Sequence, residues 1–279
     1  MKYENGAVRK RMAFDRGMEA IGFFIVSLLI LVVLSIFLFV IGNGLSGINI
    51  KILTTDGNTT SGGLFNAIIG TWLLTGVGLI ISLPVGLFGA VYISEYSNSR
   101  AGSFLKLFAD LLTGIPSIVL GFFGYLMIVV YLRFGFSLLA GGIILAIMMI
   151  PYILRISEIS LSNIPKDIRE AAYALGADKY KMILRVLLSK AKSGVIVGSV
   201  LAVSIASGET AQLLYTAGWN NGLPTGLTNS EVGYLTYVVW QGINQPSAYS
   251  HQLAFAAAFV LLVMILALIL MSKYVQRGK

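Results

Sequence analysis

Polar residues that could carry charge-dependent chemistry gather in two places of an otherwise apolar sequence. The first is the stretch Glu170-Ala171-Ala172-Tyr173-Ala174-Leu175-Gly176, which lies in the only long polar-rich interval. That interval, from Arg155 to Lys192, contains eight of the twenty Lys and Arg residues. Two alanines beside a glutamate allow close approach to a partner groove, while the charge fixes the register of binding. The stretch therefore predicts an element that a protein outside the membrane can hold.

The second place surrounds Glu209, in a segment that is apolar enough to span a membrane. Its polar neighbours in the sequence are Ser204, Ser207, Thr210 and Gln212. A charged side chain at membrane depth costs at least ~2.5 kcal/mol to insert, so Glu209 should face protein or a water-filled path. Glu209 is thus either a structural glutamate hydrogen-bonded between helices or part of a translocation path.

Two further polar positions have similar paired interpretations. Arg155, at the inner end of a predicted span, is either a snorkelling arginine that sets orientation or a cation that contacts an anion on the path. Asp110, Thr113 and Ser117 form a polar stripe in another span, which favours hydrogen bonding between helices, although Ser117 is also a candidate for the path. With one histidine and no cysteine, neither a His-based nor a thiolate metal cluster is expected, and no cofactor is predicted.

The composition decides the class of protein that carries these residues. Hydrophobic residues make up 57% of the chain and charged residues 11%, against roughly 25% charged residues in soluble domains. We therefore expect an all-α membrane protein in a lipid bilayer. Since a span needs about 20 apolar residues, six spans are predicted, and three of them contain Pro84, Pro116 or Pro151, which suggests kinks. The predicted spans are 18–42, 66–93, 104–132, 138–156, 194–216 and 251–272.

The distribution of positive charge predicts the orientation in the membrane. With the N-terminus inside, 18 of the 20 Lys and Arg residues fall on the cytoplasmic side, and only Lys51 and Arg133 fall outside. The net charge of +8 therefore indicates orientation and not nucleic-acid binding. The predicted organisation is a cytoplasmic N-terminal segment 1–17, a transmembrane part 18–272 and a cytoplasmic tail 273–279, in a multi-pass protein of the cytoplasmic membrane.

Between the fourth and fifth spans, a loop over 157–193 has the pattern of two helices joined by a turn. Pro165 suits the first turn of one helix, Gly176 its C-terminal stop, and Asp178 the N-cap of the next helix. The first helix presents one expected apolar stripe: Ile164, Ile168, Ala171, Ala172 and Leu175. From the pattern alone, the element is either a docking element or an amphipathic helix pair on the inner leaflet.

The outer side is dominated by a loop over 217–250. Residues 231–242 are too short to span the membrane and predict a helix at the outer surface, with Tyr234, Tyr237 and Trp240 on successive turns. These aromatic side chains belong either to an interfacial belt or to a docking surface or lid.

The cytoplasmic loop resembles the EAA loop of ABC importer permeases, in which Glu-Ala-Ala, a glycine and an aliphatic-x-Leu-Pro follow at fixed spacing. Glu170, Ala171, Ala172, Gly176, Val186 and Leu188 match, while Ser189 replaces the usual proline and leaves open whether the helix kinks there. The resemblance implies that Glu170, Ala171, Ala172, Gly176 and Asp178 couple the chain to an ATP-hydrolysing subunit. The sequence has no Gly-x-x-x-x-Gly-Lys-Ser/Thr stretch, so the ATPase is expected to be a separate subunit and this chain not an enzyme.

Other motifs over residues 60–216 resemble the PstA family of permease subunits of phosphate importers. They are Gly62-Gly63-Leu64, Leu83-Pro84, Glu95-Tyr96, Gly114-Ile115-Pro116-Ser117, Pro151-x-x-x-Arg155 and Gly208-Glu209-Thr210-Ala211. The resemblance implies the type I importer fold, a translocation path that includes Arg155, Ser207, Glu209, Thr210, Gln212 and Ser117, and phosphate as cargo. The implied partners are a PstC-like second permease subunit, two ATP-binding cassette subunits and an extracytoplasmic phosphate-binding protein.

Two positions depart from that family. Ile205 stands where an arginine is usual, and Gln212 where a proline is usual. Because an anion in a low-dielectric path needs positive compensation, either Arg155 and the partner subunit supply it, or the cargo is another oxyanion such as tungstate, molybdate or sulfate. More distant alternatives are an intramembrane enzyme acting on lipid phosphates and a structural subunit without a path.

Overall fold

A computed structural model describes residues 4–57, 62–96 and 100–277. Parts of three predicted segments lie outside the described residues: 1–3 of the N-terminal segment, 58–61 of the first outer loop and 278–279 of the tail. All regular elements within the described residues are helices, which confirms the all-α expectation.

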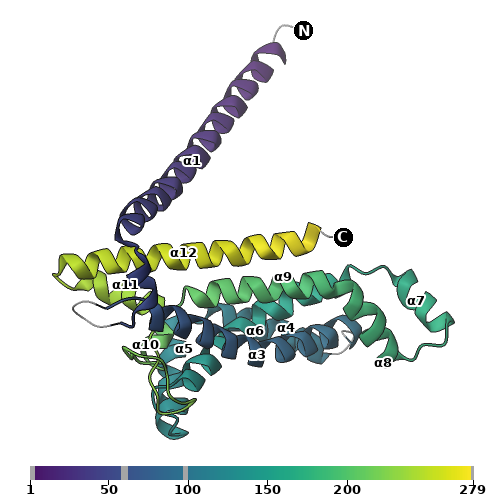
Figure 1. Ribbon diagram of the computed structural model, residues 1–279. Coiled ribbons are helices and arrows are strands. Elements are labelled where there is room, and N and C mark those ends of the chain that lie inside the picture. Colours follow the sequence, from purple (N-terminus) through teal and green to yellow (C-terminus); the bar gives the residue numbers. More distant parts are fainter. Residues whose placement is uncertain (1–3, 58–61, 97–99, 278–279) are drawn as a thin grey trace.

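The helices follow one another with short connections (Figure 1). In chain order they are α1 (Glu4–Gly47), α2 (Ile50–Thr54), α3 (Phe65–Tyr96), α4 (Arg100–Gly114), α5 (Ser117–Gly124), α6 (Leu138–Ser162), α7 (Lys166–Ala174), α8 (Lys179–Lys181), α9 (Leu188–Ser207), α10 (Ala211–Leu214), α11 (Leu235–Asn244) and α12 (Ala248–Arg277). Two π-helical stretches, Tyr125–Tyr131 and Met182–Leu187, extend α5 and join α8 to α9. Among the described residues, five helices are long and apolar enough to cross a membrane, or six if the bent pair of α4 and α5 forms one span.

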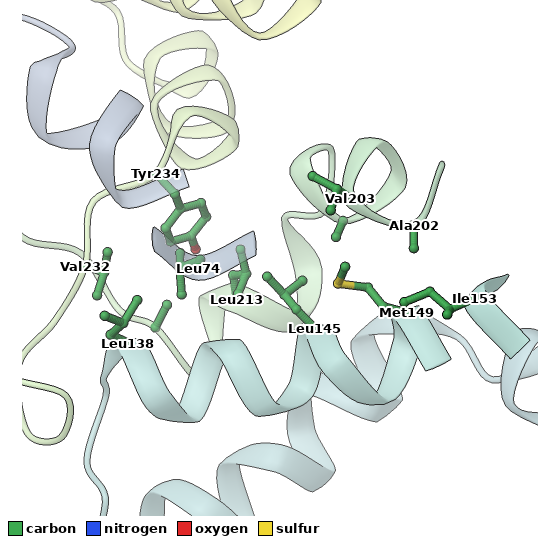
Figure 2. Packing of buried hydrophobic residues seen from close by; sticks show 12 residues of the cluster. Leu74, Leu138, Leu145, Met149, Ile153, Ala202, Val203, Leu213, Val232 and Tyr234 are labelled. Carbon is green, nitrogen blue, oxygen red and sulfur yellow. The ribbon is translucent and has the colours of Figure 1, made fainter. Parts of the chain in front are cut away.

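The core lies where α3, α6 and α9 pack against one another. Small residues allow this close approach, as expected for helices in lipid: a Cβ at Gly142 of α6 would lie 2.4 Å from Val77 of α3, and one at Gly198 of α9 would lie 3.1 Å from Ile156 of α6. Figure 2 shows the buried side chains of this core, with Leu74 and Leu213 beside the ring of Tyr234. Pro84 and Pro151 lie inside continuous helices of this core.

The third predicted span, 104–132, is wrong as a single kinked helix. The chain instead bends by 99° between α4 and α5. Pro116 has no N–H to donate, and it disfavours helical geometry at Ile115 before it. Its own ψ of 132° is not helical. The Gly114-Ile115-Pro116 sequence therefore ends one helix and begins another in a new direction.

The fifth predicted span, 194–216, begins and ends at different residues from those expected. A continuous helical segment of 29 residues runs from Lys179 to Ser207, because α8 and the π-helical stretch after it join α9 without a break. The helix ends at Gly208, so Glu209 and Thr210 lie in a connection before α10. The expectation that Glu209 lies inside the span is therefore wrong.

The polar elements lie at opposite ends of the bundle. Figure 1 shows α7 and α8 at the end of the bundle toward which the C-terminal part of α12 runs, while α10 and α11 lie at the opposite end. Helix α1 diverges from the bundle, and its most apolar window is 0% buried. It contacts α12 near Gly44, where a Cβ would lie 2.5 Å from Cβ of Phe259.

Candidate functional site

The element predicted over 157–193 contains a helix, a glycine turn and a second helix, as expected. Pro165 precedes α7 directly, and Gly176 follows it with φ = +79°. Two backbone hydrogen bonds close the turn: Gly176 N–H donates to the Tyr173 carbonyl (2.9 Å) and Ala177 N–H to the Ala172 carbonyl (3.1 Å). No atom lies within 4 Å of an added Cβ at Gly176. The left-handed backbone conformation, and not lack of space, explains the glycine.

The two sides of this element differ in burial. Its inner side contains Ala172 and Ile164, which pack with Ala90 of α3 and with Leu161, Met182, Ile183 and Leu187. Its outer side exposes Glu170, Ala171 and Tyr173, together with Leu175, whose side chain is 89% exposed. The expected single apolar stripe is therefore wrong: Ile164, Ile168 and Ala172 face the bundle, whereas Ala171 and Leu175 are exposed.

Asp178 caps α8, as predicted. Its carboxylate accepts a hydrogen bond from the Lys181 N–H at 2.7 Å. This backbone hydrogen bond, with a smaller attraction to the Lys181 and Arg185 side chains, lowers the pKa of Asp178. Ser189 lies within the continuous helix, so the absent proline leaves no break there; the π-helical stretch Met182–Leu187 precedes it.

At the other end of the bundle, three predicted path residues come together around Glu209. The half-buried carboxylate of Glu209 interacts with the Ser117 hydroxyl at the start of α5 and with the Gln212 amide of α10. Gln212 is fully buried and its Nε2 donates to Sδ of Met148 at 3.1 Å. Gly121 permits this arrangement, because a Cβ there would lie 2.5 Å from Cα of Gln212.

Glu209 also lines a very small cavity of about 10 Å³ with Ser207. Ser207 is buried and its hydroxyl donates to the Val203 carbonyl at 2.8 Å. The other polar residues of the cavity wall are Thr71, Thr75, Tyr234 and Thr236. Thr210 instead lines an open apolar crevice of about 670 Å³ between α1, α11 and α12. The structure thus groups Ser117, Ser207, Glu209 and Gln212, with Thr210 facing the other way.

Sequence reasoning missed two residues of this group. The Thr236 hydroxyl donates to the main-chain carbonyl of Glu209 at 2.7 Å. Tyr234 is 1% exposed, and its hydroxyl has no hydrogen-bond partner among the described residues. The sequence places both only within the helix 231–242 predicted at the outer surface. They lie about 25 residues beyond Glu209 in the chain, and nothing in the local pattern indicates the contact.

Arg155 lies apart from the Glu209 group. It is seven residues beyond Met148 on α6, which is about 10 Å along a helix. Its guanidinium pairs with Glu158 (3.3 Å), whose buried carboxylate also accepts a shorter contact from Lys106 of α4 (2.7 Å). The two cations share one carboxylate, so this cluster keeps a net positive charge. Lys106 is a member that the sequence pattern did not reveal.

Comparisons with known proteins found relatives that cover most of the chain. The chain is 43% identical over 227 residues to the phosphate transport system permease protein PstA 2 of Mycobacterium bovis, covering 81% of this chain and 75% of that protein. It is 35% identical to the PstA protein of Haemophilus influenzae (82% and 81% coverage). It is 33% identical to a probable PstA protein of Methanocaldococcus jannaschii (78% and 77% coverage).

Solved structures show the same fold. An inward-facing structure of the MetNI methionine ABC transporter aligns with a TM-score of 0.59 at 21% identity, covering 77% of this chain and 94% of that chain. An amino acid ABC transporter aligns with a TM-score of 0.53 at 17% identity, with 77% and 93% coverage. Residues 82–279 match the family described as binding-protein-dependent transport system inner membrane component. With its apolar helices, its exposed helix-turn-helix and these relatives, the chain belongs to that family of membrane transport components.

Proposed function

We propose that this chain is a permease subunit of an ATP-driven importer that carries inorganic phosphate across the cytoplasmic membrane. The observation that carries the proposal is the helix-turn-helix α7–α8. It lies beyond the bundle with its inner side packed on α3 and α9, and it leaves Glu170 and the apolar Leu175 side chain exposed. An exposed apolar residue beside a charge outside the membrane is typical of a surface that a partner covers. That partner is the ATPase, present as two copies of a separate subunit.

The cargo assignment is supported by the PstA relatives and by the chemistry around Glu209. Phosphate keeps a proton at neutral pH, whereas sulfate, molybdate and tungstate do not. A carboxylate among hydroxyl groups accepts a hydrogen bond from a protonated oxyanion and repels one that has no proton to donate. Glu209 makes no ion pair among the described residues, so its group suits phosphate better than the other oxyanions. Because this recognition uses a hydrogen-bond acceptor and not a cation, the absence of an arginine at 205 is compatible with phosphate as the cargo.

The path continues inward to the cluster of Lys106, Arg155 and Glu158. The net positive charge of this cluster attracts the anion at the inner end of the path. The Glu209 group, at the other end, provides no such attraction. A second, PstC-like permease subunit forms the other wall of the path, and an extracytoplasmic binding protein delivers phosphate at the side of α10 and α11. ATP binding moves α7 and opens the path outward; hydrolysis returns it inward.

This function is tested by radiolabelled phosphate uptake at micromolar concentration in cells that lack other phosphate systems. Uptake is expected with the intact gene, and neither in the deletion strain nor with Glu170→Lys, which reverses the exposed charge of α7. Asp56→Lys, the same reversal at an exposed position near the opposite end, should retain uptake. Equal uptake with and without the gene would exclude phosphate as the cargo.

A further inference from the structure

Arg169, on the coupling helix α7, bonds three separate parts of the chain. Its guanidinium donates to Oε1 of Glu95 at 2.9 Å, in the last turn of α3. The same group donates to the main-chain carbonyl of Leu161, near the end of α6, at 3.0 Å and to that of Ile164 in the connection. Both charged side chains are largely removed from solvent, with 18% of Arg169 and 7% of Glu95 exposed.

The inner end of α3 receives a second contact from the other side of the glycine turn. Nζ of Lys179, in α8, donates to the main-chain carbonyl of Glu95 at 3.1 Å and lies 3.6 Å from the centroid of the Tyr96 ring. A cation at a helix C-terminus also complements the helix dipole. The last turn of α3 is therefore held by α7 through Arg169 and by α8 through Lys179.

Directional contacts matter here because the apolar packing of α7 on the bundle is small. Ala172 is the buried residue of α7, and it joins Ala90 of α3 in a shared apolar cluster. Apolar contacts are non-directional and tolerate sliding, whereas a charge-assisted hydrogen bond fixes both distance and angle. Arg169 and Glu95 also line an open hollow of about 430 Å³ together with Glu170. The exposed residue proposed to meet the ATPase and the residues that hold α3 therefore border the same hollow.

Given the ATPase-driven function proposed above, we propose that Arg169 and Glu95 are positioning residues that fix the coupling helix to the inner end of α3, so that a displacement of α7 by the ATPase displaces α3 with it. Arginine is required because its planar fork reaches a carboxylate and two carbonyls at once, which the ammonium group of lysine cannot do in the same geometry. Without the pair, the ATPase still binds and hydrolyses ATP, but α7 moves without moving the path.

The experiment compares four complexes reconstituted in proteoliposomes with their partner subunits: wild type, Glu95→Gln, Arg169→Gln and the double variant. Three quantities are measured: co-purification of the ATPase, the rate of ATP hydrolysis, and phosphate transported per ATP hydrolysed. Arg100→Gln removes an exposed arginine at the start of α4 and serves as the matched control. Glu95→Gln should lower transport per ATP by about tenfold, as expected for loss of one charge-assisted bond. Arg169→Gln also loses its bonds to the Leu161 and Ile164 carbonyls and should lower it by at least as much, while hydrolysis and co-purification stay near wild type in both variants.

The double variant tests the pairing of Glu95 with Arg169 more strictly than the single variants do. If Glu95 and Arg169 act as one unit, the loss in the double variant should equal that of Arg169→Gln alone, because the effects of contacting residues are not additive. Wild-type transport per ATP in Glu95→Gln, or losses that multiply in the double variant, would overturn the proposal. Glu95→Gln is isosteric, so it gives this readout even if Arg169→Gln fails to assemble. A wild-type complex that hydrolyses ATP without moving phosphate would instead contradict the proposed function.

Discussion

At the scale of single residues, the two ends of the molecule use glycine for different reasons. Gly176 is needed for its positive φ, with open space around it. Gly121 has helical neighbours, and its hydrogen atom is needed because the backbone of Gln212 is in contact. A substitution at the first position strains a turn, and one at the second separates two helices, so the same change should have different consequences.

Gly176→Ala should lower phosphate uptake while leaving the amount of folded protein near normal, because a left-handed residue costs roughly 1–2 kcal/mol in one exposed turn. Gly176→Asn should recover much of the activity, since asparagine tolerates this conformation. Gly121→Ala should instead reduce the folded protein itself. Size-exclusion chromatography in detergent and uptake assays separate the two outcomes; equal loss of folded protein in all three variants would contradict the distinction.

Glu209→Gln should abolish most phosphate uptake without affecting assembly, since an amide can donate a hydrogen bond where the carboxylate only accepts. Ser207→Ala is the comparison in the same cavity, and it should have a small effect because the Ser207 hydroxyl already donates to the Val203 carbonyl. Uptake and co-purification are measured for both variants. If Glu209→Gln transports normally, Glu209 is only structural.

At the scale of elements, the sequence predicted helices well where apolar period and turn residues agree. Helices cover the predicted spans 18–42, 66–93, 138–156 and 251–272. Pro165, Gly176 and Asp178 predicted the helix-turn-helix because capping is local. The 99° bend at Pro116 was missed, because the same residue type leaves α3 and α6 continuous at Pro84 and Pro151. Packing with neighbouring helices decides between these outcomes, and it is not visible in the local pattern.

Asp178 should make the start of α8 sensitive to acid. Its pKa is lowered in the folded chain by the Lys181 N–H, so its stabilising contribution is present above the ordinary pKa of 3.8 and is lost as the pH falls through the lower folded value. Asp178→Asn can still accept the hydrogen bond but does not titrate. Amide hydrogen exchange at Lys181 should accelerate at acid pH in wild type relative to its intrinsic rate, and less so in Asp178→Asn. An identical pH response in both would contradict this role.

At the scale of the whole molecule, the contacts that build the site join distant parts of the chain. Glu209 meets Ser117 and Thr236, and Arg169 meets Glu95, 74 residues away. Sequence periodicity finds neighbours one helical turn apart. The sequence therefore indicated Ser117, Glu209 and Gln212 singly, and it did not reveal that Tyr234 and Thr236 lie beside Glu209, that Lys106 pairs with Glu158 or that Glu95 pairs with Arg169.

The predicted orientation can be tested because the chain contains no cysteine. Asn221→Cys lies in an exposed loop between α10 and α11, and Lys192→Cys is exposed near the start of α9. A membrane-impermeant maleimide should label Asn221→Cys in intact cells and Lys192→Cys only after permeabilisation. The reverse pattern would mean that the charge bias of the loops has been assigned to the wrong side.

The unbroken helix from Lys179 to Ser207 gives the molecule a lever. Its α9 part has 20 residues and extends about 30 Å at 1.5 Å per residue, ending at the connection that bears Glu209. A tilt of about 10° around the middle of α9 would move its two ends by about 3 Å in opposite directions, by that length. A displacement of a few ångströms at the end that adjoins the glycine-turn element is thus matched by a similar displacement beside Glu209.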